Sequence, residues 1–319
     1  MLPIPIRIGG HLFDHNYFFP IFYLVMTPAT RLKRIQQFIS RMPSLSTTVA
    51  KVLEICNHSS ASANDLSRVI SYDPVLTGQM LKLINSAYYG LPNRITTLAR
   101  AIVMLGVNTV KNLVLATSVL SGCQRLSKVR GLAVNDFWAH SLCVGVLSKL
   151  IAKTCQLPDR DHDDFFFAGL LHDLGKLPIM ACFSELYIKS IESSERSSYP
   201  LFKSEMIQIG FNHCQVGEII AAKWKLGAGM QAAITRHHDS APDAVPLCLV
   251  NAVGAANYLS HQFQRGSAGH HCLDPLLLQD HADRLAIPAE VLINLAAQME
   301  TELEKAKVFL QISEKGAHA

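Results

Sequence analysis

The chain shows a succession of amphipathic helices. Apolar residues recur every three or four positions, and almost no stretch alternates in the way typical of strands. Ser62-Ala-Asn-Asp65 has the form of a capping box, Asp73 followed by Pro74 is a typical helix start, and Gly106 can end a helix. The pattern predicts an all-α protein. The expected helices span residues 29–40, 47–57, 65–71, 75–88, 99–105, 107–120, 136–155, 165–183, 201–210, 214–226, 230–237, 247–263 and 288–312.

The order of these helices predicts two lobes. Residues 29–121 would form an N-terminal lobe and residues 134–264 a second lobe, joined by a polar connection. The apolar faces of the first lobe are too wide for five short helices to bury alone, so we expect this lobe to pack against the second. Residues 265–319 should add a C-terminal helical segment after a loop at 270–274, and residues 1–28 should be a poorly ordered extension.

Composition narrows the class of protein. Hydrophobic residues make up 49% of the 319 residues and charged residues 17%, which excludes an intrinsically disordered chain. The net charge of +4 makes a nucleic-acid partner unlikely. The apolar run at residues 17–26 is half of the about 20 residues that span a bilayer and contains Pro20, so we expect no membrane segment. The 8 cysteines are scattered without a C-x-x-C pair, which indicates reduced thiols and a cytoplasmic protein.

Histidines in apolar surroundings supply the candidate chemistry. A lone core histidine is usually bonded to a backbone carbonyl, but five such residues on separate segments are explained together by a shared metal. Consecutive residues on a helix point about 100° apart, so His172 and Asp173 can share a site only where the helix bends, as Gly175 allows. Two metals bridged by Asp173 also fit. The proposed ligands are His140, His172, Asp173, His213, His237 and His238.

Three further residues have two interpretations each. Asp136 lies four residues before His140 and is either an additional ligand or a helix N-cap. Lys176 either holds a phosphate or interacts with the end of a helix. His162 lies in a polar segment, where we expect solvated surface.

Several segments resemble known families. Gly169-Leu-Leu-His-Asp-Leu-Gly-Lys176 resembles the signature of the HD superfamily of metal-dependent phosphohydrolases. Segments at residues 42–45, 69–77, 82–89 and 101–107 resemble the narrower HDOD family, the HD-related output domain of bacterial signalling proteins. Trp138-Ala-His-Ser, the stretch 217–226 and the pair His237-His238 continue this resemblance, which covers residues 40–262.

The resemblance implies a multi-helix HD-like bundle with regulatory function. Many HDOD proteins have lost metal ligands and act through protein contacts, whereas the histidines and Asp173 of this chain match ligand positions of the related HD-GYP phosphodiesterases, which bind two or three metals. Asp136 falls where some of them have an additional acidic ligand. Asn257, or less favourably Asn251, stands at the closing aspartate of the pattern, and no Gly-Tyr-Pro follows His238.

The residues and the resemblance leave three candidate functions. The first is a bacterial regulatory protein that keeps one or two divalent metal ions, Fe or Mn before Zn or Ni, and contacts other signalling proteins. The second is a metal-dependent phosphohydrolase acting on a nucleotide or cyclic dinucleotide, with Asp173 and Lys176 as catalytic residues. The third, a nucleic-acid binder, is the weakest because the net charge is small.

Overall fold

The computed structural model describes residues 26–42, 46–56, 62–123, 134–239, 247–267, 269 and 275–311. Within these ranges every regular element is a helix, which confirms the all-α prediction. The expected extension up to residue 25 and the loop at 270–274 lie outside them. The elements are α2 (Pro28–Arg41), α3 (Thr47–Cys56), α4 (Ala63–Ser71), α5 (Pro74–Ile84), α6 (Leu98–Cys123), α7 (Val134–Thr154), η3 (Asp159–Asp161), α8 (His162–Leu171), α9 (Lys176–Ser197), α10 (Leu201–Gln208), α11 (His213–Lys223), α12 (Ala228–Arg236), α13 (Leu247–Gln262), α14 (Pro275–Leu285), α15 (Ala289–Ile293) and α16 (Ala296–Ala306).

The start signals in the first lobe have the expected geometry. The Ser62 hydroxyl accepts a hydrogen bond from the backbone of Asp65 at 3.1 Å, at the start of α4. The Asp73 carboxylate accepts one from the backbone of Leu76 at 2.9 Å, and Pro74 begins α5. Gly106 adopts φ +83° and bends α6, because the left-handed region is open to glycine.

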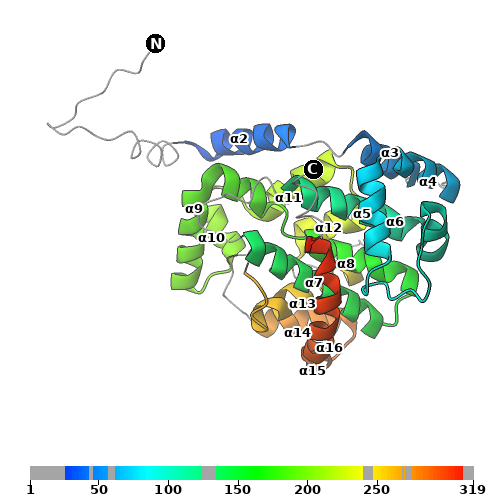
Figure 1. The fold of residues 1–319 in the computed structure, drawn as a ribbon. Helices are drawn as coiled ribbons and strands as arrows, with labels where there is room; N and C mark the ends of the chain where they lie inside the picture. The colour runs from blue at the N-terminus through cyan, green and yellow to red at the C-terminus, as the bar shows by residue number, and fades with distance from the viewer. Residues whose placement is uncertain are drawn as a thin grey trace, which may run out of the picture.

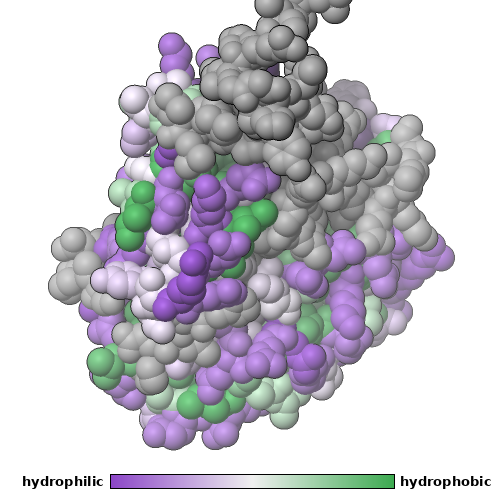
Figure 2. Space-filling model, turned by 90° about the vertical axis from the view of Figure 1, so that its left-hand side faces the viewer, coloured by the Kyte–Doolittle hydropathy of each residue, from purple (hydrophilic) through white to green (hydrophobic). Residues whose placement is uncertain are grey.

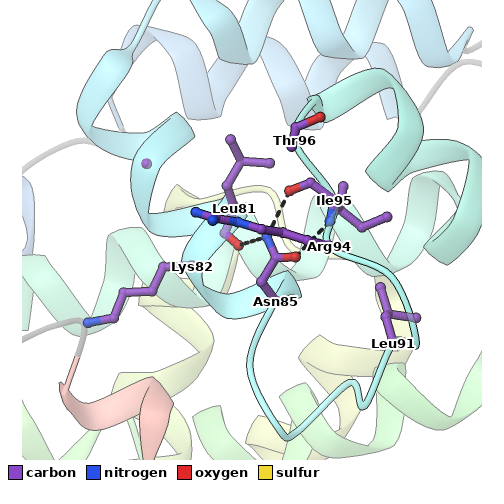
Figure 3. Close-up of a pocket in the computed structure, with 8 residues that line it drawn as sticks. Leu81, Lys82, Asn85, Leu91, Arg94, Ile95 and Thr96 are labelled. Carbon is purple, nitrogen blue, oxygen red and sulfur yellow. Dashed lines mark hydrogen bonds between the residues drawn. The ribbon is translucent and has the colours of Figure 1, made fainter.

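Helix α5 ends earlier than predicted, because the side chain of Asn85 is hydrogen-bonded to the loop that follows. Its side-chain amide donates to the carbonyls of Leu81 and Ile95 at 2.7 and 2.8 Å and accepts from the Ile95 backbone at 2.7 Å (Figure 3). Asn85 also lines a surface pocket of about 740 Å³, together with Lys82 and Arg94. The pocket belongs to the first lobe and shares no lining residue with the second.

The two lobes pack against each other, as the wide apolar faces predict. Helix α6 lies against α8, and α7 at the centre packs on α8 and α13 (Figure 1). The Lys149 ammonium donates to the Tyr88 hydroxyl at 3.1 Å across the boundary, and Asn112 of α6 donates to Asp164 of α8.

Helix α2 departs from the expected division. It opens the first lobe in sequence but packs on α9 and α11 of the second (Figure 1). The Arg31 guanidinium donates to the carbonyls of Gln208 and Ile209 at 3.1 and 3.0 Å. In return, the Lys223 ammonium donates to the carbonyl of Met42 at 3.1 Å, just past the end of α2.

The C-terminal segment differs from the single helix predicted at 288–312. It consists of α15 and α16, separated at Asn294 and buried Leu295, and α14 precedes them without having been predicted. After α16 the ring of Phe309 is buried against those of Tyr88, Phe166 and Phe167. The segment therefore completes the core where the lobes meet.

Two stretches have the length and apolar composition of membrane-spanning helices, Leu98–Leu120 and Asp159–Ser197. Within the apolar windows of these stretches, 56% and 94% of the residues are buried inside the protein. Core helices of a globular protein have the same composition, so this feature is weak support for a membrane segment. On the face of α9 and α10, the coloured part of Figure 2 shows hydrophobic side chains lying among hydrophilic ones.

Candidate functional site

A tight turn at residues 172–175 interrupts the helix predicted at 165–183 and separates α8 from α9. The turn presents both His172 and Asp173 to the interior. A Cβ atom at Gly175 would lie 1.9 Å from the carbonyl oxygen of His213 and 2.6 Å from the backbone nitrogen of Gly217. Only glycine therefore lets this turn lie directly on the start of α11.

One oxygen of the Asp173 carboxylate faces α7 and the turn. Oδ2 is 2.6 Å from the Lys176 ammonium, 3.3 Å from Nε2 of His172 and 3.7 Å from Nε2 of His140. The side chains of Asp173 and both histidines are completely buried. The donor atoms of His140, His172 and Asp173 form a group in which all lie within 4.8 Å of one another.

The other oxygen of Asp173 faces α11 and α12. Oδ1 is 3.4 Å from Nε2 of His213 and 3.7 Å from Nε2 of His237. His238 approaches from the same side, with its Nε2 3.0 Å from that of His213 and its ring stacked on Phe202. The carboxylate thus lies between two groups of imidazoles.

Backbone carbonyls set the orientation of two of the rings. Nδ1–H of His172 donates to the carbonyl of Gly169 at 2.8 Å, and Nδ1–H of His237 donates to that of Ala233 at 3.0 Å. Because a carbonyl only accepts, Nδ1 carries the proton and Nε2 keeps its lone pair. Neither Nε2 has a hydrogen-bond partner within the described ranges, so both lone pairs are available to a ligand.

Glu205 of α10 orients His213. Its Oε2 accepts from Nδ1 of the ring at 2.7 Å and from the backbone of His213 at 2.8 Å. Burial works to lower the pKa of this imidazole, but the carboxylate outweighs it and raises the pKa to about 10. A carboxylate behind a histidine is a common arrangement at metal sites. No pattern in the sequence indicates this role of Glu205, since an acidic residue in an amphipathic helix is usually solvated.

Burial favours the neutral form of three other imidazoles. It lowers the pKa of His140, His237 and His238 well below the usual value, and the neighbouring histidines add to the effect. Burial alone would raise the pKa of Asp173, but the adjacent imidazole of His172 and the ammonium of Lys176 lower this pKa well below its usual range. A divalent ion binds neutral imidazoles beside an ionised carboxylate, so His213 has to release one of its two ring protons to join the others as a ligand.

The remaining candidates have different positions. Asn257 is buried beside His140, whose Nδ1 lies 3.1 Å from the hydroxyl of Ser260. Asp136 is exposed at the start of α7, and no hydrogen bond or ion pair between described residues joins its carboxylate to the cluster. The expectation that His162 is solvated is wrong: the ring is 6% exposed, and its Nε2 lies 2.8 Å from the carbonyl of Leu157.

Known proteins share this arrangement of helices. An HDOD domain protein of unknown function from Geobacter sulfurreducens superposes with a TM-score of 0.67 at 21% identity, covering 89% of this chain and 99% of its own. A proposed phosphohydrolase from Shewanella amazonensis SB2B gives a TM-score of 0.65 at 22% identity, covering 87% and 98%. Both likenesses concern the fold.

Sequence comparison gives the family. An uncharacterized protein of Treponema pallidum (strain Nichols) is 24% identical over 216 residues, which are 67% of this chain and 41% of that protein. The chain thus spans less than half the length of this curated relative. The model of the HDOD domain matches residues 42–240, which include the described cluster from His140 to His238. The chain belongs to the HDOD family.

Proposed function

We propose that this protein is a bacterial, cytoplasmic signalling module that binds divalent metal in the histidine–aspartate cluster and acts through contacts with other proteins. One observation carries the metal part of the proposal. Nε2 of His140, His172 and His237 and Oδ1 of Asp173 are buried without a hydrogen-bond partner in the described structure. An unsatisfied buried polar atom costs about 1–3 kcal/mol, and a metal ion meets several of these atoms at once.

The division of the donors favours two ions. His140 and His172 face Oδ2 of Asp173, and His213 and His237 face Oδ1. A carboxylate with one oxygen toward each group is suited to bridge two ions, which in such sites are about 3.5–4 Å apart. Imidazole and carboxylate donors suit divalent Fe, Mn, Zn or Ni.

The burial of the cluster supports a regulatory role for the metal. His172 and Asp173 have no exposed surface, whereas catalytic metal sites keep a coordination position open to water or substrate. Asn257 supplies no charge at the position where the resemblance expects an aspartate. Metal in such a site would stabilise the fold.

The first lobe offers surface for a protein partner. Tyr72 is 78% exposed and Val103 77% exposed, and the nearby Val75 and Met104 are exposed as well. These apolar side chains lie on α4, α5 and α6 and the turn between them, helices that pack against one another. Exposed apolar side chains on neighbouring helices are typical of interaction surfaces.

The alternative is a metal-dependent phosphohydrolase acting on a nucleotide or cyclic dinucleotide. Lys176 favours it, because its ammonium lies 2.6 Å from Asp173 and could hold a phosphate beside the metal. The fold likeness to the proposed Shewanella phosphohydrolase is consistent with this alternative.

The two functions separate in one set of measurements on the full chain. Metal content, melting temperature and turnover of bis(p-nitrophenyl) phosphate are measured for the wild type, Asp173→Ala and the control Asp136→Ala, which removes an exposed carboxylate at the start of α7. We expect Asp173→Ala to lose metal and melting temperature together, and Asp136→Ala to keep both. Metal-dependent turnover that disappears in Asp173→Ala at unchanged melting temperature would establish the phosphohydrolase. A wild type without metal contradicts both functions.

A further inference from the structure

A cysteine lies among the histidines on one side of Asp173. Cys214 follows His213 in the first turn of α11 and is 8% exposed. Its sulfur and one ring nitrogen each of His213, His237 and His238 all lie within 4.8 Å of one another. His237 is 1% exposed and its Nε2 has no hydrogen-bond partner among the described residues, so an unsatisfied donor already points to a ligand here.

We propose that Cys214 is a thiolate ligand of the ion on the α11 side, an inference that rests on the proposed metal site. Donor atoms bound to one tetrahedral zinc ion, at about 2.3 Å for sulfur and 2.0–2.1 Å for nitrogen, are about 3.3–3.6 Å apart. The four donors here all lie within 4.8 Å of one another, so side-chain movements of about an ångström bring them onto one ion. The thiol releases its proton when it binds the ion.

The two sides of Asp173 then prefer different ions. The group of His140, His172 and Asp173 offers nitrogen and oxygen only. The group on α11 and α12 adds sulfur, a soft donor that suits Zn, Co or Fe(II) better than Mn or Mg. We infer a site with one permissive position and one that selects against hard ions.

Other cysteines serve as controls. Cys182 is 7% exposed, nearly as buried as Cys214, and burial raises the pKa of its thiol to about 11. It lies on α9 outside both groups of donor atoms. A serine at this position changes a buried thiol without removing a proposed ligand.

Cobalt substitution of the full chain tests the proposal. We expect a thiolate-to-cobalt charge-transfer band in the near ultraviolet for the wild type and for Cys182→Ser, and its loss in Cys214→Ser. Loss of the ligand should weaken binding of one cobalt ion by about 10- to 100-fold or more. Cobalt bound to the wild type without this band, or a band that persists in Cys214→Ser, overturns the role of Cys214 and leaves the proposed metal site intact. A wild type that binds no cobalt overturns both.

A measurement on the wild type alone covers the case in which Cys214→Ser does not fold. X-ray absorption of the zinc-loaded protein should show a sulfur scatterer at about 2.3 Å beside nitrogen and oxygen at about 2.0–2.2 Å. Zinc surrounded by nitrogen and oxygen alone contradicts the proposal.

Discussion

The cores of the two lobes differ in what they bury. The buried residues of α3, α4 and α5 are all hydrophobic, so the packing of this part follows from the amphipathic pattern. The second lobe instead buries Asp173, Lys176 and Glu205 together with several histidines. Burying charged groups costs desolvation free energy, and well-packed hydrophobic residues in the same positions would avoid this cost. The comparison indicates that the first lobe is built for stability and the second around a ligand.

Removal of metal should have the largest effect and should distinguish the lobes. A ligand at a thousandfold excess over its Kd stabilises the folded state by about 4 kcal/mol, and a chelator removes this contribution. We expect amide hydrogen exchange to accelerate in the turn 172–175 and in α11 while α4 and α5 keep their protection. Equal acceleration in both lobes, or none, would contradict the claim that the second lobe is the one built around a ligand.

Substitution of one glycine in each lobe gives a second test of the difference between the lobes. Gly175→Ala places a Cβ against the backbone of His213, which cannot move without displacing the cluster, so we expect a loss of about 3 kcal/mol or more. Gly78→Ala in α5 meets nothing within 4 Å and should stabilise the protein by about 0.5–1 kcal/mol through helix propensity. Urea unfolding measures both. Similar stability of the two variants would show that the turn does not lie on α11 as described.

Stability should also depend on pH through His281 in α14. Burial lowers the pKa of this imidazole to about 4, and its Nδ1–H donates to Asn251 at 3.0 Å. Between pH 6.5 and 4 the unfolded chain binds the proton and the folded chain does not, so stability falls as pH falls. The loss through this group is about 3 kcal/mol. His281→Gln should show a flatter decline of unfolding free energy over this range, and parallel curves would exclude His281 as the cause.

Local signals predicted much of the fold. Helix starts at Ser62 and Asp73 and the bend at Gly106 depend on neighbouring residues only, so the sequence is sufficient for them. The end of α5 depends on Asn85 reaching Ile95 across a loop, which helical periodicity does not reveal. The position of α2 on the second lobe likewise depends on contacts from Arg31 to distant carbonyls.

The histidine–aspartate cluster likewise combines features that local sequence reveals with contacts that it does not. Its histidines and Asp173 could be identified because imidazoles in apolar helices require partners. The groups that orient them could not, since Glu205 and Ser260 reach their histidines through tertiary packing. The prediction for His162 is wrong because the sequence neighbours of this residue are polar, whereas its own ring turns inward to the carbonyl of Leu157.

The most direct test of the metal centre is a crystal structure of the zinc-replete protein with anomalous scattering. We expect two peaks, one beside each oxygen of Asp173, with Nε2 of His140 and His172 at about 2.0–2.1 Å from one ion and Nε2 of His213 and His237 near the other. An absence of anomalous density in the cluster, with Lys176 still paired to Asp173, would contradict it.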